Sequence, residues 1–113
     1  MRSDADLQRE KDFKKPMLQK LGGFHEPMDE EEYREALSGE KRSLVEFYAG
    51  GCGPCIQIEP YVRQKCREKG VNLVKVDTKI NDEVPSWYGV EVMPTFCVMD
   101  QYGMMMKMLL GAS

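Results

Sequence analysis

Four residues near the middle of the chain, Cys52-Gly53-Pro54-Cys55, place two thiols three residues apart. They follow a short apolar run, 44–48, which is typical of a buried strand, and they open a segment with the pattern of a helix. The free backbone N–H groups at a helix N-terminus favour the thiolate form of a cysteine, and the thiolate is the nucleophile in disulfide exchange. The spacing and the placement therefore predict a redox-active dithiol.

The composition of the whole chain limits the classes of protein to consider. The 113 residues, 42% of them hydrophobic, suffice for one compact domain around a single core. The 16 basic and 19 acidic residues are interspersed, with a net charge of −3, so no basic stripe indicates binding to nucleic acid or to an anionic membrane. No apolar run approaches the roughly 18 residues that span a bilayer. The N-terminus lacks the apolar core of a signal peptide, so we expect a cytoplasmic protein that is not secreted.

The periodicity of apolar residues predicts an α/β domain over residues 21–113, preceded by a polar N-terminal extension over residues 1–20. Strands are expected at 21–25, 44–48, 71–77, 95–99 and 104–110, and helices at 29–38, 52–69 and 82–88. A turn at 100–103 gives the last two strands the pattern of a hairpin. This order predicts a central mixed sheet of four to five strands flanked by helices.

Three separated motifs resemble the thioredoxin family and occur in the family's order. Residues 45–55 are similar to its active-site signature, Pro60 lies where its second helix kinks, and residues 93–96 resemble its cis-proline segment. Gly111 falls where a glycine borders the family's substrate groove. The resemblance covers about residues 24–113. It implies a thioredoxin-like fold and protein disulfide reduction, with a thioredoxin reductase as electron donor.

The two thiols are expected to play different parts in the reaction. Cys52, the more exposed thiol, would attack a target disulfide as the thiolate, and Cys55, one turn further along, would resolve the mixed disulfide. Gly53-Pro54 would stiffen the loop and keep the two sulfur atoms close enough to bridge. The resemblance implies a substrate-binding surface for protein disulfides at Gly51, Gly53, Pro54, Met93, Pro94 and Gly111.

Glu46 is an acidic residue within an otherwise apolar strand. An unpaired buried carboxylate costs several kcal/mol unless it takes up a proton, which suits such a group to proton transfer. Thioredoxins carry an acid at this position, usually aspartate, that helps to deprotonate the resolving cysteine, and the resemblance implies the same role for Glu46. The alternative is a glutamate at a sheet edge that is solvated.

Pro94 and the residue before it carry a further implication of the resemblance. X-Pro bonds are cis in only about 5–6% of cases in folded proteins, so the sequence alone favours trans. The resemblance instead implies a cis Met93–Pro94 bond that faces the dithiol. The Met93 backbone would then be open to strand-like pairing with an extended substrate chain.

The sequence indicates neither a cofactor nor a metal. A structural zinc site needs four ligands and usually a second close pair of them, whereas Cys66, Cys97 and His25 are isolated. Haem attachment needs a histidine directly after Cys55, where this chain has Ile56. Cys66 and Cys97 are expected to be small core residues. The predicted site therefore works with thiols alone and takes its electrons from a reductase.

Two features depart from the family pattern. Gly51 occupies the position before the nucleophile where thioredoxins almost always carry tryptophan, so a wider site is expected. The family also continues after its last strand with a helix that covers one sheet face, whereas this sequence ends at Ser113. The strand Met104–Leu110 is mainly apolar on either side, so an open sheet face is expected. Residues 1–20 could fold over it, a partner protein could cover it, or the sequence could be truncated.

These departures leave a second function open. The chain would then be a thioredoxin-like structural or redox-sensing subunit of a large assembly that covers Met104–Leu110, such as an axonemal dynein arm light chain. That hypothesis gives it a cytoskeletal or axonemal location. The dithiol, the acidic residue and the proline motif favour the disulfide reductase, which is the primary prediction.

Overall fold

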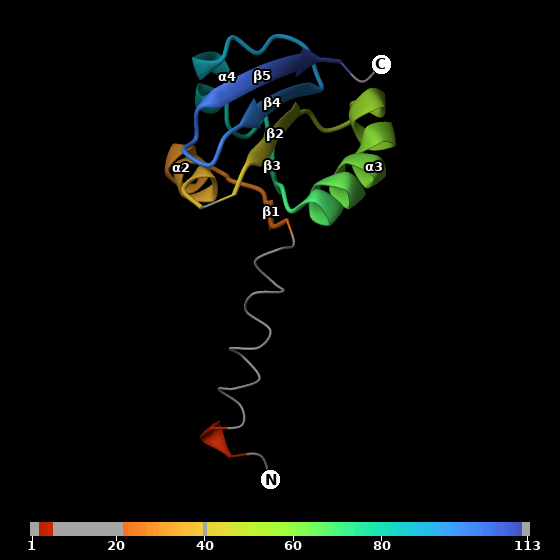
Figure 1. Ribbon diagram of the computed structural model, residues 1–113. Helices are drawn as coiled ribbons and strands as arrows, with labels where there is room; N and C mark the ends of the chain where they lie inside the picture. The colour runs from red at the N-terminus through yellow and green to blue at the C-terminus, as the bar shows by residue number, and fades with distance from the viewer. Residues whose placement is uncertain (1–2, 6–21, 40, 112–113) are drawn as a thin grey trace.

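A computed structural model of the chain describes residues 3–5, 22–39 and 41–111. The predicted N-terminal extension, 1–20, lies almost entirely outside these residues, so its boundary with the domain stays a prediction. The elements that carry the fold are, in chain order, β1 (Phe24–His25), α2 (Glu30–Leu37), β2 (Ser43–Tyr48), α3 (Gly53–Lys69), β3 (Asn72–Asp77), α4 (Glu83–Trp87), β4 (Thr95–Met99) and β5 (Met105–Leu110). The predicted order of strands and helices is confirmed (Figure 1).

The five strands form one mixed sheet in the order β1-β3-β2-β4-β5. β2 lies at its centre and pairs parallel with β3 and antiparallel with β4. β1 pairs parallel with β3, and β5 pairs antiparallel with β4 as the predicted hairpin requires. The register places Glu46 of β2 directly beside Lys75 of β3 and opposite Phe96 of β4. The α/β class and the mixed sheet predicted from the sequence are confirmed.

Each face of the sheet has its own apolar layer, and the helices divide between the two faces (Figure 1). One layer lies under α2 and α4 and contains Tyr33, Ala36, Val45, Phe47, Val74, Val76, Val84, Cys97 and Met99. The other lies under α3 and contains Val62, Cys66, Leu73 and Phe96. The alternation of side chains along a strand explains this division, because successive residues point to opposite faces.

The first strand is shorter than the predicted span of 21–25, whose first residue lies outside the described part of the chain. Gly22 approaches the backbone so closely that a Cβ there would lie 2.1 Å from the carbonyl oxygen of Val71. The backbone N–H of Gly23 donates to the side-chain oxygen of Asn72, at 2.9 Å. These close contacts hold the glycine pair beside β3 without extending the strand.

β5 forms an edge of the sheet and is largely exposed on both faces, rather than on one alone. The alternation that marks a half-buried strand is missing, and only Met108 among its residues packs partly against the core. Met104 and Leu110 are 67% and 64% exposed. Within residues 22–39 and 41–111, no helix covers this strand. The same residues contain no helix that is both long and apolar enough to cross a membrane.

Candidate active site

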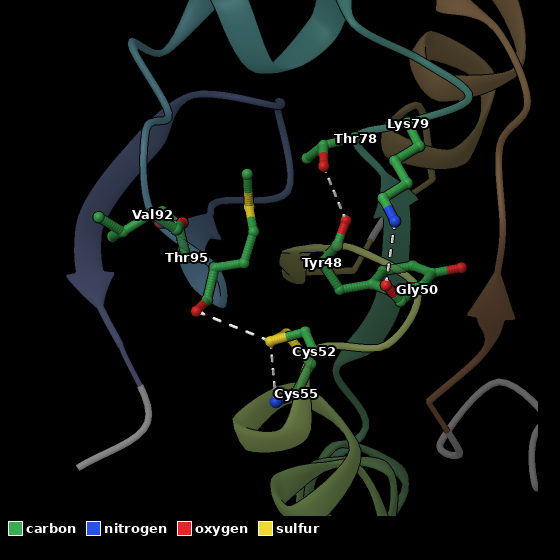
Figure 2. Close-up of a disulfide and its surroundings, with 9 residues drawn as sticks. Tyr48, Gly50, Cys52, Cys55, Thr78, Lys79, Val92 and Thr95 are labelled. Atoms are coloured by element: carbon green, nitrogen blue, oxygen red, sulfur yellow. Dashed lines mark hydrogen bonds between the residues drawn. A yellow bond between two sulfur atoms is a disulfide. The ribbon is translucent and has the colours of Figure 1, made fainter.

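The two cysteines of the Cys-x-x-Cys motif lie where the turn after β2 enters α3 (Figure 2). They form a disulfide with a Cα–Cα distance of 5.3 Å, within the normal range for such a bond. Cys52 is half-buried, whereas Cys55 is only 4% exposed. The predicted difference in accessibility between the two sulfur atoms is therefore present in the structure.

Cys52 is the N-cap of α3 rather than its first helical residue, so the predicted start of the helix was one residue early. Its backbone is extended, and its Sγ accepts the backbone N–H of Cys55 at 3.3 Å (Figure 2). The N–H groups of the first helical turn lack partners within the helix and carry the positive end of its dipole. A negative charge on Cys52 Sγ is stabilised at this position, which lowers the cost of forming the thiolate.

The turn before the dithiol leaves the first cysteine open on one side. The turn is held by a backbone hydrogen bond in which the N–H of Cys52 donates to the Ala49 carbonyl at 3.2 Å. Gly51 has φ +80°, a left-handed conformation that glycine adopts readily, and no atom lies within 4 Å of where its Cβ would be. Lys79 reaches the rim of the turn, where its Nζ donates to the Gly50 carbonyl at 3.2 Å (Figure 2). The site is open where the family usually carries tryptophan.

The proline segment borders the dithiol, as the resemblance implied. The Met93–Pro94 peptide bond is cis. The Met93 carbonyl oxygen lies 3.8 Å from Cys52 Sγ, and the N–H of Gly111 donates to the Pro94 carbonyl at 2.8 Å. The structure thus brings the Met93 backbone beside Cys52 Sγ and joins Gly111 to Pro94, whose side chain is fully buried.

Glu46 is fully buried at the centre of the sheet, so the alternative of a solvated residue at a sheet edge is wrong. Neither carboxylate oxygen has a hydrogen-bond partner among the described residues. Burial raises the pKa of Glu46 to about 7, with Lys75 lowering it and Glu59 raising it. A carboxyl with this pKa can both bind and release a proton at neutral pH.

Sequence reasoning missed the two charged residues that accompany Glu46. The Nζ of Lys75 lies 2.6 Å from the Oε1 of Glu59, and the Lys75 side chain is 7% exposed. A signal was present in the sequence, because Lys75 is a lysine within an apolar strand. The pairing itself depends on the register of β2 with β3 and on where α3 lies, and neither can be read from the sequence pattern.

The other two cysteines lie apart from the dithiol, in the two buried layers of the sheet. Cys66 lies on the buried face of α3 and Cys97 on β4, at 7% and 0% exposure. Burial raises the pKa of each thiol to about 11. Both are therefore neutral thiols at pH 7, in agreement with their predicted role as core residues.

A mixed α/β sheet with a dithiol at a helix N-terminus and a cis-proline beside it defines a thiol–disulfide exchange protein of the thioredoxin fold. The thioredoxin family model matches residues 25–112. The chain belongs to the thioredoxin family.

The relatives found by comparison include several thioredoxins. The chain is 35% identical over 81 residues to thioredoxin 1 of Nostoc sp., an alignment that covers 70% of this chain and 75% of that protein. It is 37% identical over 79 residues to a thioredoxin of Streptomyces clavuligerus, an alignment that covers 69% of this chain and 73% of that protein.

The chain also resembles solved structures of thioredoxins. The reduced thioredoxin pre-protein of Schistosoma mansoni gives a TM-score of 0.75 at 28% identity, covering 81% of this chain and 89% of that one. Fasciola hepatica thioredoxin gives a TM-score of 0.72 at 28% identity, and the match covers 79% of this chain and 88% of that one.

These matches identify the reaction class as thioredoxin-type protein disulfide reduction, the primary prediction. They also imply, in general terms, protein disulfides as substrates and a reductase as partner. They give no support to the alternative of an axonemal dynein arm light chain or to an axonemal location.

Proposed function

We propose that this protein reduces disulfides of other proteins with Cys52 as the nucleophile and Cys55 as the resolving thiol. The observation that carries the proposal is the difference between the two sulfur atoms. Cys52 is accessible and lies at the N-terminus of α3, where the thiolate is favoured, whereas Cys55 is buried one turn later. An accessible thiolate attacks first, and a protected thiol in contact with it completes the exchange.

The reaction balances with the residues of this site. In the reduced protein the Cys52 thiolate attacks one sulfur atom of the substrate disulfide, the substrate S–S bond breaks, and one substrate thiol leaves. Cys55 then loses its proton and attacks Cys52 Sγ, which releases the second substrate thiol and forms the Cys52–Cys55 disulfide. Two electrons and two protons pass to the substrate. A thioredoxin reductase is the proposed source of the electrons that restore the dithiol.

Glu46 is the proposed proton-transfer group for the second step. The Cys55 thiol must give up its proton within a buried environment, where few acceptors exist. A buried carboxyl with a pKa near 7 serves as a base in one step and returns the proton in the next. A thioredoxin with this proton route works best near neutral pH, in a reducing compartment such as the cytoplasm.

The substrate chain is proposed to lie along the proline segment. The Met93 carbonyl faces Cys52, and the backbone link between Gly111 and Pro94 fixes the rim of the surface. An extended peptide can pair with the Met93 backbone as an added strand, which places its disulfide against Cys52 Sγ. Gly51, Gly53 and Pro54, which flank Cys52 in the sequence, are exposed and offer no long side chain that would obstruct the approach.

A protein contact over β5 is a further proposal, supported by the exposed apolar residues Met104, Met105, Met106, Leu109 and Leu110. It is compatible with reductase activity, because the contact lies on the strand rather than on the sulfur atoms. Size-exclusion chromatography with light scattering tests it against a Met104→Glu, Met106→Glu variant. A monodisperse monomer with unchanged behaviour in the variant would argue against a contact between two copies of this chain.

Insulin reduction in the presence of dithiothreitol tests the activity itself. The natural chain should accelerate the precipitation of reduced insulin, and Cys52→Ser should reduce the rate to that of dithiothreitol alone. Cys97→Ser, a substitution at a buried cysteine on the face of the sheet opposite to Glu46, is the matched control and should keep the activity. Activity retained by Cys52→Ser would refute the proposed nucleophile.

A further inference from the structure

Three charged side chains gather on the face of the sheet that α3 covers. Glu46 and Lys75 are paired positions of adjacent parallel strands, so both side chains leave the sheet on the same face. Leu44 and Leu73, which share that face, pack in the layer beneath α3. Glu59 enters from the helix above and lies 2.6 Å from Lys75. One buried cation therefore stands within reach of two carboxylates.

Lys75 donates to the partly exposed carboxylate of Glu59 and leaves the buried carboxyl of Glu46 without a partner among the described residues. Lys75 Nζ donates to Glu59 Oε1 and lies 4.2 Å from the centre of the Tyr48 ring. The Glu59 side chain is 29% exposed, whereas Glu46 is fully buried and neither of its oxygens has a hydrogen-bond partner in the described residues. An ion pair with Glu46 would satisfy a buried group, so its absence calls for a competing interaction, which Glu59 provides.

We propose that Glu59 is a positioning residue that draws the Lys75 ammonium away from Glu46 and thereby leaves Glu46 free to bind and release a proton near neutral pH. This inference deepens the proposed function and rests on it for the step that Glu46 serves. Glu59 touches neither substrate nor sulfur in this assignment. It acts through Lys75 alone.

The other titratable groups around Glu46 do not carry charge at neutral pH. Cys66 on α3 and Tyr48 on β2 both interact with the Glu46 charge, but burial raises the pKa of each and holds them neutral. Phe96, opposite Glu46 on β4, is apolar. The dithiol at the N-terminus of α3 is neutral when oxidised. In this oxidised form, Lys75 and Glu59 are the charges that set the proton affinity of Glu46.

Removing the Glu59 charge should therefore change the titration of Glu46. In Glu59→Gln the ammonium loses its anionic partner and can pair with Glu46, which stabilises the carboxylate and makes it a weaker base. Glu68→Gln is the matched control, because Glu68 lies on the same helix and its carboxylate contacts Gln64 and Lys65 on the exposed side. The probe is the carbon-13 signal of the Glu46 carboxyl, followed by NMR from pH 4 to 9 in the oxidised protein.

The expected result is a titration midpoint for Glu46 that falls by about one pH unit or more in Glu59→Gln, a tenfold loss of proton affinity, and that stays in place in Glu68→Gln. A midpoint that is the same in Glu59→Gln as in the natural chain would overturn the proposal. Lys75→Met gives a second, independent measurement, because removal of the cation should raise the midpoint.

The double variant shows whether Glu59 acts through Lys75. In a Lys75→Met background, Glu59→Gln should shift the midpoint by much less than it does in the natural chain. Equal shifts in the two backgrounds would contradict positioning through Lys75 and would indicate a direct effect of the Glu59 charge.

Kinetics of the second chemical step distinguish this proposal from the proposed role of Glu46. If the midpoint moves and the rate of mixed-disulfide resolution falls about threefold to tenfold near pH 7, the positioning role of Glu59 and the proton-transfer role of Glu46 are both supported. If the midpoint moves and the resolution rate is unchanged, Glu59 is a positioning residue and the proton-transfer role of Glu46 is wrong. If the midpoint does not move, the positioning role is wrong whatever the rate does.

Discussion

The carbonyl oxygen of Met93 lies 3.8 Å from Cys52 Sγ, although 41 residues separate the two in the sequence. The contact joins the N-terminus of α3 to the loop that enters β4, which lie on either side of the accessible sulfur atom (Figure 2). A substrate chain that pairs with the Met93 backbone is thereby held against the nucleophile. The contact links the chemistry of the dithiol to the binding of extended protein segments.

The proton route predicts that Glu46→Gln slows the second step more than the first. Glutamine keeps the size of the side chain but cannot accept the Cys55 proton, so resolution of the mixed disulfide should slow by at least about tenfold. Attack by Cys52 does not require the loss of the Cys55 proton, so its rate should change by less than about threefold. Stopped-flow kinetics with a peptide disulfide separate the two steps. Equal slowing of both would refute the role of Glu46 as a base for Cys55.

The same substitution should stabilise the oxidised protein at alkaline pH. The pKa of Glu46 is about 7 in the folded state against 4.5 for an ordinary glutamate, so the folded state holds its proton more tightly than the unfolded chain. The free energy of unfolding therefore falls as pH rises from about 4.5 to about 7 and stays lower above that range, by about 3 kcal/mol.

Urea denaturation at pH 4.5 and pH 8 measures this effect. Glu46→Gln removes the ionisation, so its gain in the free energy of unfolding should be large at pH 8 and small at pH 4.5. Glu68→Gln, at an exposed position of α3, should give no such difference. A gain that is the same at both pH values would show that burial of the Glu46 charge does not cost stability.

Gly51 and Gly53 should respond differently to alanine. A Cβ meets no atom within 4 Å at either position, so packing does not distinguish them. Gly51 has φ +80°, where an L-residue is strained, whereas Gly53 begins a helix. Gly51→Ala should lower the free energy of unfolding by about 1 kcal/mol, and Gly53→Ala should leave it unchanged or raise it slightly. Thermal and urea denaturation of the oxidised variants would reveal the opposite order if the argument is incorrect.

The four cysteines of the reduced protein should react at very different rates. Cys52 is half-buried at a helix N-terminus, whereas Cys66 and Cys97 are buried with thiol pKa values of about 11. At pH 7 only about one in 10,000 of such thiols is ionised, so iodoacetamide should modify Cys52 at least about a hundredfold faster. Mass spectrometry of peptides from timed samples gives the order. Early modification of Cys66 or Cys97 in the folded protein would contradict their assignment to the core.

The sequence predicted an element correctly where the pattern of apolar residues agreed with the burial of that element in the folded protein. The central strand 44–48 and the hairpin at the end of the chain are buried or paired as their patterns indicated. The glycine pair at 22–23 was assigned to a strand because its close approach to the backbone of Val71 is a tertiary contact. The exposure of β5 on both faces also depends on which helices lie beside the strand, a property that its own residues do not encode.

Some residues of the candidate site could be predicted from the sequence, and others could not. The positions of Cys52 and of the Met93-Pro94 segment follow from motifs whose spacing along the chain is informative, and the structure places the Met93 carbonyl beside Cys52. The pairing of Lys75 with Glu59 could not be predicted from the sequence, because it depends on how β3 and α3 pack against each other. A lysine beside a buried acid becomes visible only once the register of β2 and β3 is known.

Trapping the mixed disulfide tests the central assignment most directly. A Cys55→Ser variant of the reduced protein, incubated with a protein that contains disulfides, should accumulate a covalent complex because the resolving thiol is absent. Peptide mass spectrometry should locate the bond at Cys52, and the matched Cys52→Ser variant should trap nothing. The expected result is a single bond to Cys52. A complex linked through another cysteine, or an equal yield from the two variants, would contradict it.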